Sequence, residues 1–218
     1  MPRYKLLIFD WDGTLADSAG MIVRAMQGAI RDLSLPQRSD DSIAELIGLG
    51  LNEALTRLYP ELDLEELRRA LSAYRAQWLS EGAGEAELFP GALATLRALQ
   101  ADSYRIAIAT GKSRRGLNRS LQHHAEVAAL VHASRCADET ASKPDPLMLR
   151  EIIGELALVP SDALMIGDTE YDMEMARRIG MPALGVTCGV HAADRLRAAG
   201  AIALVDDVGR VADWLHSR

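Results

Sequence analysis

The chain has 218 residues, with 24 lysines and arginines against 31 aspartates and glutamates, so its formal net charge is −7. Because a domain typically has about 150 residues, the length predicts one domain, or one domain with a smaller insertion. Hydrophobic residues make up 49% of the chain and charged residues 25%, a globular balance that argues against disorder. The acidic balance argues against general nucleic-acid binding, which needs a dense basic face, but not against an anionic substrate, which responds to the local field of a site.

Cysteine usage and hydropathy favour a cytoplasmic protein. Cys136 and Cys188 are too few and too scattered for a disulfide scaffold or a zinc cluster, so we interpret them as buried thiols in a reduced compartment. The first residues lack the pattern of a signal peptide, and no apolar run approaches the roughly 20 residues of a membrane span. We expect no membrane and no nucleic-acid partner, and the sequence leaves both a monomer and a homodimer open.

The first expected strand, Leu6–Phe9, is followed by a long segment without strand patterns. Residues 17–85 instead predict helices near Ala19–Leu33, Asp40–Ile47, Asn52–Leu58 and Leu64–Leu79. We interpret this segment as an all-helical cap domain, residues 17–85, inserted into a core domain formed by residues 1–16 and 86–218. Hinges are expected near Asp17-Ser18 and at residues 81–86, where glycines interrupt the helical pattern.

Strand and helix patterns alternate from residue 91 onward. Further strands are expected at Arg105–Ala109 and Ala163–Ile166, and weaker ones at Ala128–Ala133, Ala183–Val186 and Ala201–Val205. Helices are expected at Gly91–Gln100, Arg115–His123, Pro146–Leu156, Tyr171–Ile179, Ala192–Ala199 and Val208–His216. This alternation predicts an α/β fold with a Rossmann-like parallel sheet covered on both faces.

Polar residues follow three of the expected strands where each one ends. These residues are Asp10-Trp11-Asp12-Gly13-Thr14, Thr110-Gly111-Lys112, and Gly167-Asp168 with Asp172 four residues on. The carboxyl ends of parallel strands meet at one edge of a sheet, where ligands bind, so we expect these side chains to lie together. Lys143, in a loop before a helix, would add an ammonium group.

This set of residues suits phosphoryl transfer. A phosphate dianion repels a carboxylate nucleophile unless cations screen both, and Lys143 and a Mg²⁺ ion on Asp10 and Asp168 would supply them. The Thr110 hydroxyl and the loop amides after Asp10, beginning at Trp11, would hold the remaining phosphate oxygens. These groups together predict a phosphate site at the sheet edge.

The two aspartates of the first motif have different predicted roles. Asp10 would attack phosphorus and form an aspartyl phosphate. Asp12 lies beyond the strand end, so the chain must curl to bring its carboxylate to the leaving group, and Gly13 permits such a turn. Asp12 would then protonate the leaving oxygen and later deprotonate the attacking water.

The chain resembles the haloacid dehalogenase superfamily, specifically its phosphatases with a helical cap after the first motif. The resemblance extends from Tyr4 to about Leu215. It rests on four motifs in the expected order, Asp10-x-Asp12-Gly13-Thr14-Leu15, Thr110-Gly111, Lys143-Pro144 and Gly167-Asp168-x-x-x-Asp172.

The resemblance implies a role for each motif residue. It makes Asp10 the nucleophile and Asp12 the acid/base, and it assigns phosphate binding to Thr110 and Lys143. It places Mg²⁺ between Asp10, the Asp12 carbonyl oxygen and Asp168. Asp172 would lie next to the metal or among the residues that contact the metal ligands. The stretch from Phe89 to Lys112 is similar to that of phosphoglycolate phosphatases. Phosphoglycolate is therefore the first expected substrate, while sugar phosphates, nucleotide monophosphates and other small metabolites stay open.

Other chemistries of the same superfamily fit less well. Haloacid dehalogenases generally lack an aspartate at the position of Asp12, and phosphonoacetaldehyde hydrolases use a cap lysine, whereas no lysine lies between Lys5 and Lys112. Sugar-phosphate mutases generally carry a cap arginine, which the segment Ala44–Gly48 lacks. A phosphomutase and a non-catalytic phosphate-binding or switch protein are the alternatives.

The turn at Gly48-Leu49-Gly50 resembles the cap loop that reaches the site in relatives. It would offer substrate backbone amides and apolar contacts but no cation, so a small or neutral-tailed phosphomonoester fits better than a bisphosphate. A plain turn between helices is the alternative. Arg114 and Arg115, after the Thr110 motif, are interpreted as solvated surface side chains.

Overall fold

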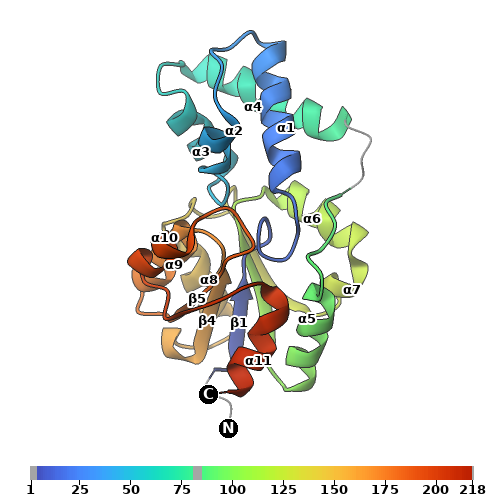
Figure 1. Cartoon of the computed structure of the whole chain (residues 1–218), viewed down its shortest axis with the longest axis vertical. Helices are drawn as coiled ribbons and strands as arrows, with labels where there is room; N and C mark the ends of the chain where they lie inside the picture. The colour runs from blue at the N-terminus through green and yellow to red at the C-terminus, as the bar shows by residue number, and fades with distance from the viewer. Residues whose placement is uncertain (1–3, 81–84, 218) are drawn as a thin grey trace.

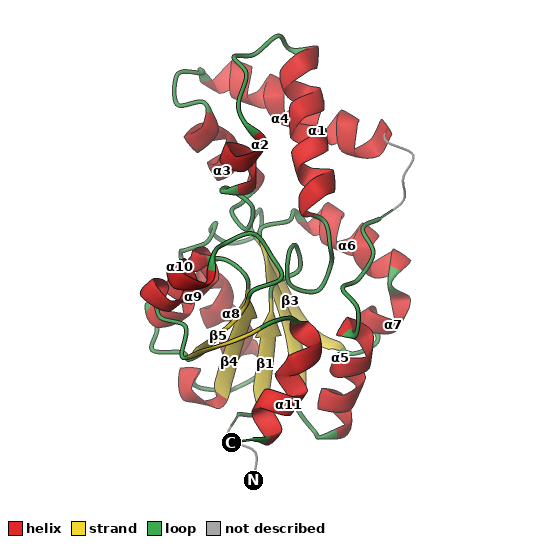
Figure 2. Cartoon of the chain, viewed as in Figure 1, coloured by secondary structure: helices red, strands yellow, loops and turns green. Residues whose placement is uncertain are grey.

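The computed structural model describes residues 4–80 and 85–217, arranged as a helical region above an α/β region (Figure 1). Both chain ends lie at the bottom of the α/β region, far from the helical region (Figure 1). Strands occur only in the lower part, and helices and loops alone make up the upper part (Figure 2). None of the described helices is long and apolar enough to cross a bilayer.

A parallel sheet of six described strands forms the centre of the α/β region. The strands are β1 (Leu6–Phe9), β2 (Arg105–Thr110), β3 (Val131–Cys136), β4 (Ala163–Gly167), β5 (Ala183–Val186) and β6 (Ala203–Val205). Their order is β3-β2-β1-β4-β5-β6, so the direction of winding reverses between β1 and β4. This order confirms the expected Rossmann-like fold, in which ligands bind beyond the strand ends at the point of reversal.

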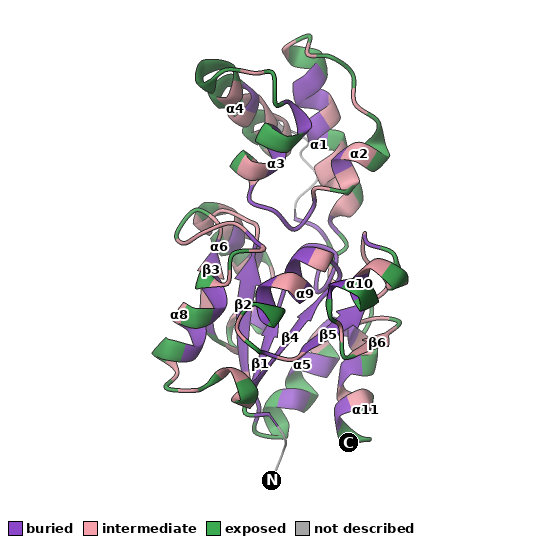
Figure 3. Ribbon diagram, turned by 90° about the vertical axis from the view of Figure 1, so that its left-hand side faces the viewer, coloured by how far each residue is buried: buried purple, intermediate pink, exposed green. Residues whose placement is uncertain are grey.

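Alternate residues of each strand face opposite layers of helices. Leu7 and Phe9 belong to one apolar cluster, and Leu6 and Ile8 belong to another. The first cluster is covered by α5 (Ala92–Ala101), α6 (Arg114–His123), α7 (Ala125–Ala128), η2 (Val208–Arg210) and α11 (Val211–His216). The second is covered by α8 (Leu147–Glu155), α9 (Glu170–Arg177) and α10 (Ala193–Ala199), while η1 (Pro160–Asp162) precedes β4. The central strands are therefore buried on both faces, as Figure 3 shows.

The helical region has an apolar cluster of its own. It consists of α1 (Ala19–Asp32), α2 (Asp40–Ala44), α3 (Leu51–Leu58) and α4 (Leu64–Ser80). Met26, Ile30, Leu55 and Tyr59 are among the residues that fill the space between these helices. The two segments that connect the helical region to the α/β region run side by side. The Asp17 amide donates a hydrogen bond to the Glu87 carbonyl and the Phe89 amide donates one to the Leu15 carbonyl, both at 2.9 Å.

The strand expected at Ala128–Ala133 is wrong at its start. Residues 125–128 form the short helix α7, and the strand β3 begins at Val131 and extends to Cys136. β3 is an edge strand, and His132 is exposed, so the apolar run of a fully buried strand is missing there. Cys136 is a buried free thiol, whereas the free thiol of Cys188 is only partly buried.

Candidate active site

The loop after β1 curls back on itself directly above the sheet. The Asp10 amide donates to the Ile166 carbonyl of β4 at 2.9 Å, which holds Asp10 between the two strands where the winding reverses. The Trp11 carbonyl accepts hydrogen bonds from the amides of Leu15 and Ala16, both at 3.0 Å. Gly13 has a φ of +81°, and a Cβ there would collide with the Asp168 carboxylate. A glycine is therefore required for this turn to approach Asp168.

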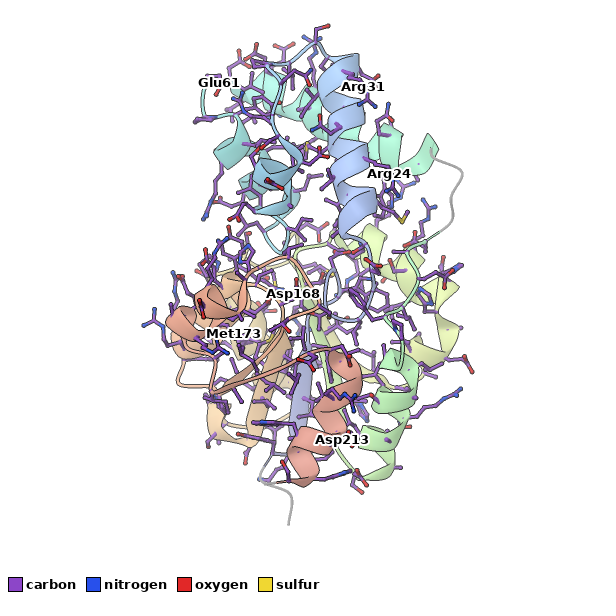
Figure 4. All side chains as sticks on the ribbon, in the orientation of Figure 1. Arg24, Arg31, Glu61, Asp168, Met173 and Asp213 are labelled. Atoms are coloured by element: carbon purple, nitrogen blue, oxygen red, sulfur yellow. The ribbon has the colours of Figure 1, made fainter. Side chains whose placement is uncertain are left out.

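Three buried carboxylates meet at this edge of the sheet. Asp10, Asp168 and Asp172 each offer an oxygen, and these oxygens all lie within 4.8 Å of one another. Asp168 accepts hydrogen bonds from the Thr14 hydroxyl at 2.7 Å and the Val190 amide at 3.0 Å. The carboxylate of Asp172 accepts a hydrogen bond from the Thr169 hydroxyl at 2.7 Å. Figure 4 shows Asp168 at the upper edge of the sheet, below the helical region.

Lys143 is the cation of this cluster. Its ammonium lies 2.8 Å from Oδ1 of Asp10 and 2.7 Å from Oδ1 of Asp172, and its side chain is fully buried. One ammonium cannot neutralise three ionised carboxylates. Oδ2 of Asp10 is also buried and has no hydrogen-bond partner among the described residues. The cluster therefore has the excess negative charge and the closely spaced carboxylate oxygens that a divalent cation needs.

Burial controls the ionisation of these groups. Desolvation raises the pKa of Asp10 well above its usual range, although Lys143 opposes the rise, and it raises the pKa of Asp168 to about 7, with Asp172 adding to the effect. Burial alone would lower the pKa of Lys143, but Asp10 and Asp172 raise it above its ordinary value. Lys143 is therefore a permanent cation, whereas Asp10 and Asp168 would bind protons more readily than exposed carboxylates.

Asp12 lies outside this cluster and has a separate set of partners. Its Oδ1 accepts hydrogen bonds from the Ser18 hydroxyl at 2.6 Å and from the Lys112 ammonium at 2.9 Å. Ser18 stands at the N-cap position of α1, yet its hydroxyl does not cap the helix. Two donors from different segments thus fix the direction of the Asp12 carboxylate.

The predicted phosphate ligands are placed at the same edge. Thr110 ends β2 and is fully buried, and its hydroxyl oxygen accepts a hydrogen bond from the Lys112 amide at 3.2 Å. The Trp11 amide donates a hydrogen bond to Oδ1 of Asp10 at 2.7 Å. The Trp11 ring is buried in the apolar cluster and is not part of the site surface.

The turn at Gly48–Gly50 descends from the helical region onto the strand ends. The Gly50 amide donates to the Ser142 hydroxyl at 2.8 Å, and Leu49 packs against Tyr171. A Cβ on Gly111 would lie 2.5 Å from the Leu49 carbonyl oxygen and 2.6 Å from that of Gly48. The turn therefore lies against the Thr110 motif, and this contact depends on the missing side chain of Gly111.

A cavity of about 440 Å³ lies between the helical region and the sheet edge. Asp12, Gly48, Leu49, Gly111 and Lys112 line it. Its other walls come from α1, α3, α4 and α6 and from the segment 137–142. Of the predicted catalytic and metal-binding carboxylates, Asp12 lines the cavity, while Asp10, Asp168 and Asp172 lie outside its lining.

Several contacts of the site escaped the sequence interpretation. Lysine is rare in this chain, so Lys112 could be singled out from the sequence. Its ion pair with Asp12 could not be predicted, because the two residues are a hundred positions apart. Ser18 was noted only as part of an expected hinge, and its hydrogen bond to Asp12 was not predicted. His191 is buried, accepts a hydrogen bond from the Glu170 amide at 3.1 Å on Nδ1 and faces the Glu45 carbonyl at 3.2 Å through Nε2. Arg114 pairs with Glu139 and is only partly solvated, and Arg115 lines the cavity.

The fold and the clustered acidic residues are those of a known class of hydrolases. Residues 7–186 match the model of the haloacid dehalogenase-like hydrolase family. The chain belongs to this family and is an enzyme of this hydrolase class.

Relatives of known name and structure cover almost the whole chain. The chain is 34% identical to the protein named "Probable phosphatase IndB" of Dickeya dadantii, over 97% of this chain and 94% of that protein. It is 28% identical to a phosphoglycolate phosphatase of Rhodospirillum rubrum, over 97% and 90%. A haloacid dehalogenase-like hydrolase from Bacteroides fragilis superposes with a TM-score of 0.88 at 28% identity, over 95% of this chain and 99% of that chain.

Proposed function

We propose that the protein is a Mg²⁺-dependent phosphomonoesterase that acts on a small phosphorylated metabolite through an aspartyl phosphate on Asp10. The observation that carries the proposal is the buried Asp10 carboxylate, which has one oxygen held by Lys143 and the other without a hydrogen-bond partner among the described residues. A carboxylate nucleophile needs such a free oxygen and a neighbouring cation. The names of two relatives support phosphatase activity.

The residues of the cluster fit a magnesium ion. Mg²⁺ prefers oxygen ligands and is held by one or two carboxylates together with substrate phosphate. Asp10, Asp168 and the Asp12 carbonyl oxygen would hold the ion, with Asp172 beside it. When bound, Mg²⁺ would neutralise charge on the transferring phosphoryl group.

The chain's own residues supply the remaining chemistry. Oδ2 of Asp10 attacks phosphorus, the bond to the leaving oxygen breaks, and Asp12 gives that oxygen a proton. Asp12 then takes a proton from water, whose oxygen attacks the aspartyl phosphate and releases inorganic phosphate and free Asp10. Lys143 and the Thr110 hydroxyl hold phosphate oxygens. Gly48 and Leu49 cover the leaving group from the helical region.

Residues 17–85 would act as a cap domain on a core domain of residues 1–16 and 86–218. The enzyme would work in the cytoplasm. The docked turn at Gly48–Gly50 excludes bulk water from the strand ends, which protects an aspartyl phosphate from uncontrolled attack. Phosphoglycolate is the reference substrate because a relative bears its name.

The test is phosphate release from a panel of phosphomonoesters with Mg²⁺ or EDTA. Asp10→Asn is the catalytic variant, and Asp102→Asn, at an exposed aspartate paired with His216, is the matched control. We expect activity with Mg²⁺ in the wild type and in Asp102→Asn, and none with EDTA or in Asp10→Asn. After acid quenching, mass spectrometry should find a phosphoryl group on the peptide that contains Asp10. Undiminished activity of Asp10→Asn would overturn the proposal.

A further inference from the structure

The cavity above the sheet is too large for the leaving group of phosphoglycolate. Its volume is about 440 Å³, within the range of pockets that bind drug-sized molecules. Glycolate has only a handful of non-hydrogen atoms and would fill roughly a third of this space if each atom took the ~30 Å³ of a water molecule. A natural ligand that fits the cavity is therefore a larger molecule.

The position of Asp12 identifies the cavity as the leaving-group side of the site. Asp12 lines the cavity, whereas Asp10, Asp168 and Lys143 lie outside its lining. A general acid must touch the leaving oxygen, while the nucleophile attacks from the other side of phosphorus. The group attached to that oxygen consequently extends into the cavity, between α4 of the helical region and α6 of the core.

The wall on the helical side is mainly apolar and aromatic, and its polar members are Asn52 and Glu53 of α3 and Arg75 of α4. It includes Ile22, Ile47, Leu71, Tyr74 and Trp78. The rings of Tyr74 and Trp78 stack, with centroids 6.2 Å apart and planes 26° apart. A leaving group that carried only hydroxyls would leave its polar atoms unmatched against this wall. A largely apolar body, such as a ring, is the complementary shape and chemistry.

The cavity lining has a small excess of basic side chains, although the whole chain is acidic. The basic residues are Arg75, Lys112, Arg115 and Arg119, and the acidic residues are Asp12, Glu53 and Asp138. Arg75 of α4 and Arg115 of α6 line the cavity, both are exposed, and neither has an acidic partner within residues 4–80 and 85–217. The nearby Arg119 is different, because it pairs with Glu85 at 2.7 Å. Two arginines that have no acidic partner in the described part of the chain lie at the mouth of the cavity and, in a chain of net charge −7, favour an anion there.

We propose that the substrate is a phosphomonoester whose leaving group has an apolar ring-sized body, packed against Tyr74 and Trp78, and ends in an anionic group held by Arg75 and Arg115. This inference rests on the proposed phosphatase function and specifies the substrate class of the same site. It also revises the expectation of a small or neutral-tailed leaving group, because the cations come from α4 and α6 and not from the turn at Gly48–Gly50.

The experiment compares four alkyl phosphates whose leaving groups differ in size and charge. They are ethyl phosphate, 2-phosphoglycolate, benzyl phosphate and 4-carboxybenzyl phosphate, and all are esters of aliphatic alcohols, so the leaving groups have comparable reactivity. We expect kcat/KM for benzyl phosphate to exceed that for ethyl phosphate by about 50-fold through apolar burial. The added carboxylate should raise kcat/KM by a further factor of about five, the effect of an exposed ion pair.

Variants assign these preferences to named residues. Trp78→Ala should reduce the ratio of benzyl to ethyl phosphate, and the double variant Arg75→Ala/Arg115→Ala should reduce the ratio of 4-carboxybenzyl to benzyl phosphate to about one. Arg150→Ala, at an exposed arginine of α8 outside the cavity, is the matched control and should change neither ratio. Ratios are used because they do not depend on the fraction of folded enzyme.

Binding separates the failure of this inference from the failure of the proposed function. Calorimetry with Asp10→Asn measures affinity for the same four esters without turnover. A preference for 2-phosphoglycolate over both benzyl esters, in turnover and in binding, would overturn the inference and leave the phosphatase intact. No turnover of any ester by the wild type, with 4-carboxybenzyl phosphate still bound most tightly, would overturn the phosphatase and keep the leaving-group pocket as a binding site.

Discussion

Nζ of Lys112 lies 2.9 Å from Oδ1 of Asp12, and the same ammonium lies 5.0 Å from the centroid of the Trp78 ring. Lys112 follows β2 in the core, whereas Trp78 belongs to α4 in the helical region. One ammonium therefore touches the proposed general acid and the wall of the helical region. Because the same ammonium interacts with both, we expect the position of α4 and the orientation of Asp12 to be linked.

Replacing Lys112 should slow the hydrolysis of esters whose leaving group needs a proton more than that of esters whose leaving group does not. In Lys112→Met, Asp12 keeps only the hydrogen bond from Ser18, so its orientation toward the leaving oxygen is weakened. We expect kcat for alkyl phosphates to fall by about 10- to 100-fold, which is part of the roughly 10²–10⁴-fold that general acid–base catalysis contributes. With 4-nitrophenyl phosphate, whose leaving group needs no proton, the loss should be small. An equal loss with both kinds of ester would indicate a structural role only, and Lys112→Arg should restore part of the difference.

Mg²⁺ should stabilise the protein more at high pH than at low pH. The metal-free folded protein retains the Asp168 proton up to a pKa of about 7, because burial raises that pKa, while the unfolded chain loses it near pH 4. The folded state then binds more protons between these values, so its stability falls as the pH rises from about 4 to 7. A metal ion that needs ionised carboxylates offsets this loss only where they are ionised.

Thermal unfolding with and without Mg²⁺ measures this effect. The increase in Tm on adding Mg²⁺ should be larger at pH 8 than at pH 6, and Asp168→Asn should abolish most of it. A pH-independent increase in Tm would show that Asp168 does not titrate in this range or does not contribute to metal binding.

Removing Lys143 should destabilise the fold far more than removing a surface lysine. Lys143→Met leaves Asp10 and Asp172 without their buried cation, a change that costs about 3–5 kcal/mol in comparable buried pairs. Lys5 pairs with Asp162 at 3.0 Å, but its side chain is 61% exposed, so Lys5→Met should cost less than about 1 kcal/mol. Chemical denaturation without Mg²⁺ measures both values, and similar losses for the two variants would contradict this account.

A side chain at Gly111 should disturb the turn from the helical region. In Gly111→Ala, the new Cβ would lie within 2.6 Å of the Gly48 and Leu49 carbonyl oxygens, so the turn must move away from the strand ends. We expect kcat/KM to fall by about tenfold or more, because a misplacement of about 1 Å can cost up to about 100-fold. The Tm should change little, since the helical region and the sheet keep separate apolar clusters.

Gly154→Ala is the control for this variant. A Cβ on Gly154, in α8, would meet nothing within 4 Å, so activity should be unchanged and stability equal or slightly higher. Wild-type kcat/KM in Gly111→Ala would show that the turn does not need to rest on this residue.

The positions of most strands and the gathering of the polar motifs were predictable, because strand burial and the residues at strand ends are read from local patterns. Leu6–Phe9 is an uninterrupted apolar run ending at Asp10, and parallel strands bring such ends to one edge. Asp10, Asp168, Asp172 and Lys143 accordingly lie together in the structure. The edge strand β3 was misplaced by several residues because it is only half buried and carries no continuous apolar pattern.

Contacts between distant, individually unremarkable residues were decided only by the tertiary structure. No local pattern pairs Lys112 with Asp12 or aims the Ser18 hydroxyl away from its own helix, because these contacts depend on how loops from separate strands stack. The same holds for the cavity, whose aromatic wall and arginines come from helices about forty residues apart in sequence. The sequence by itself determined the sheet and the chemistry at its edge, since strand burial and strand-end residues are local properties. The packing of the helical region against the core decided the shape and charge of the space for the substrate.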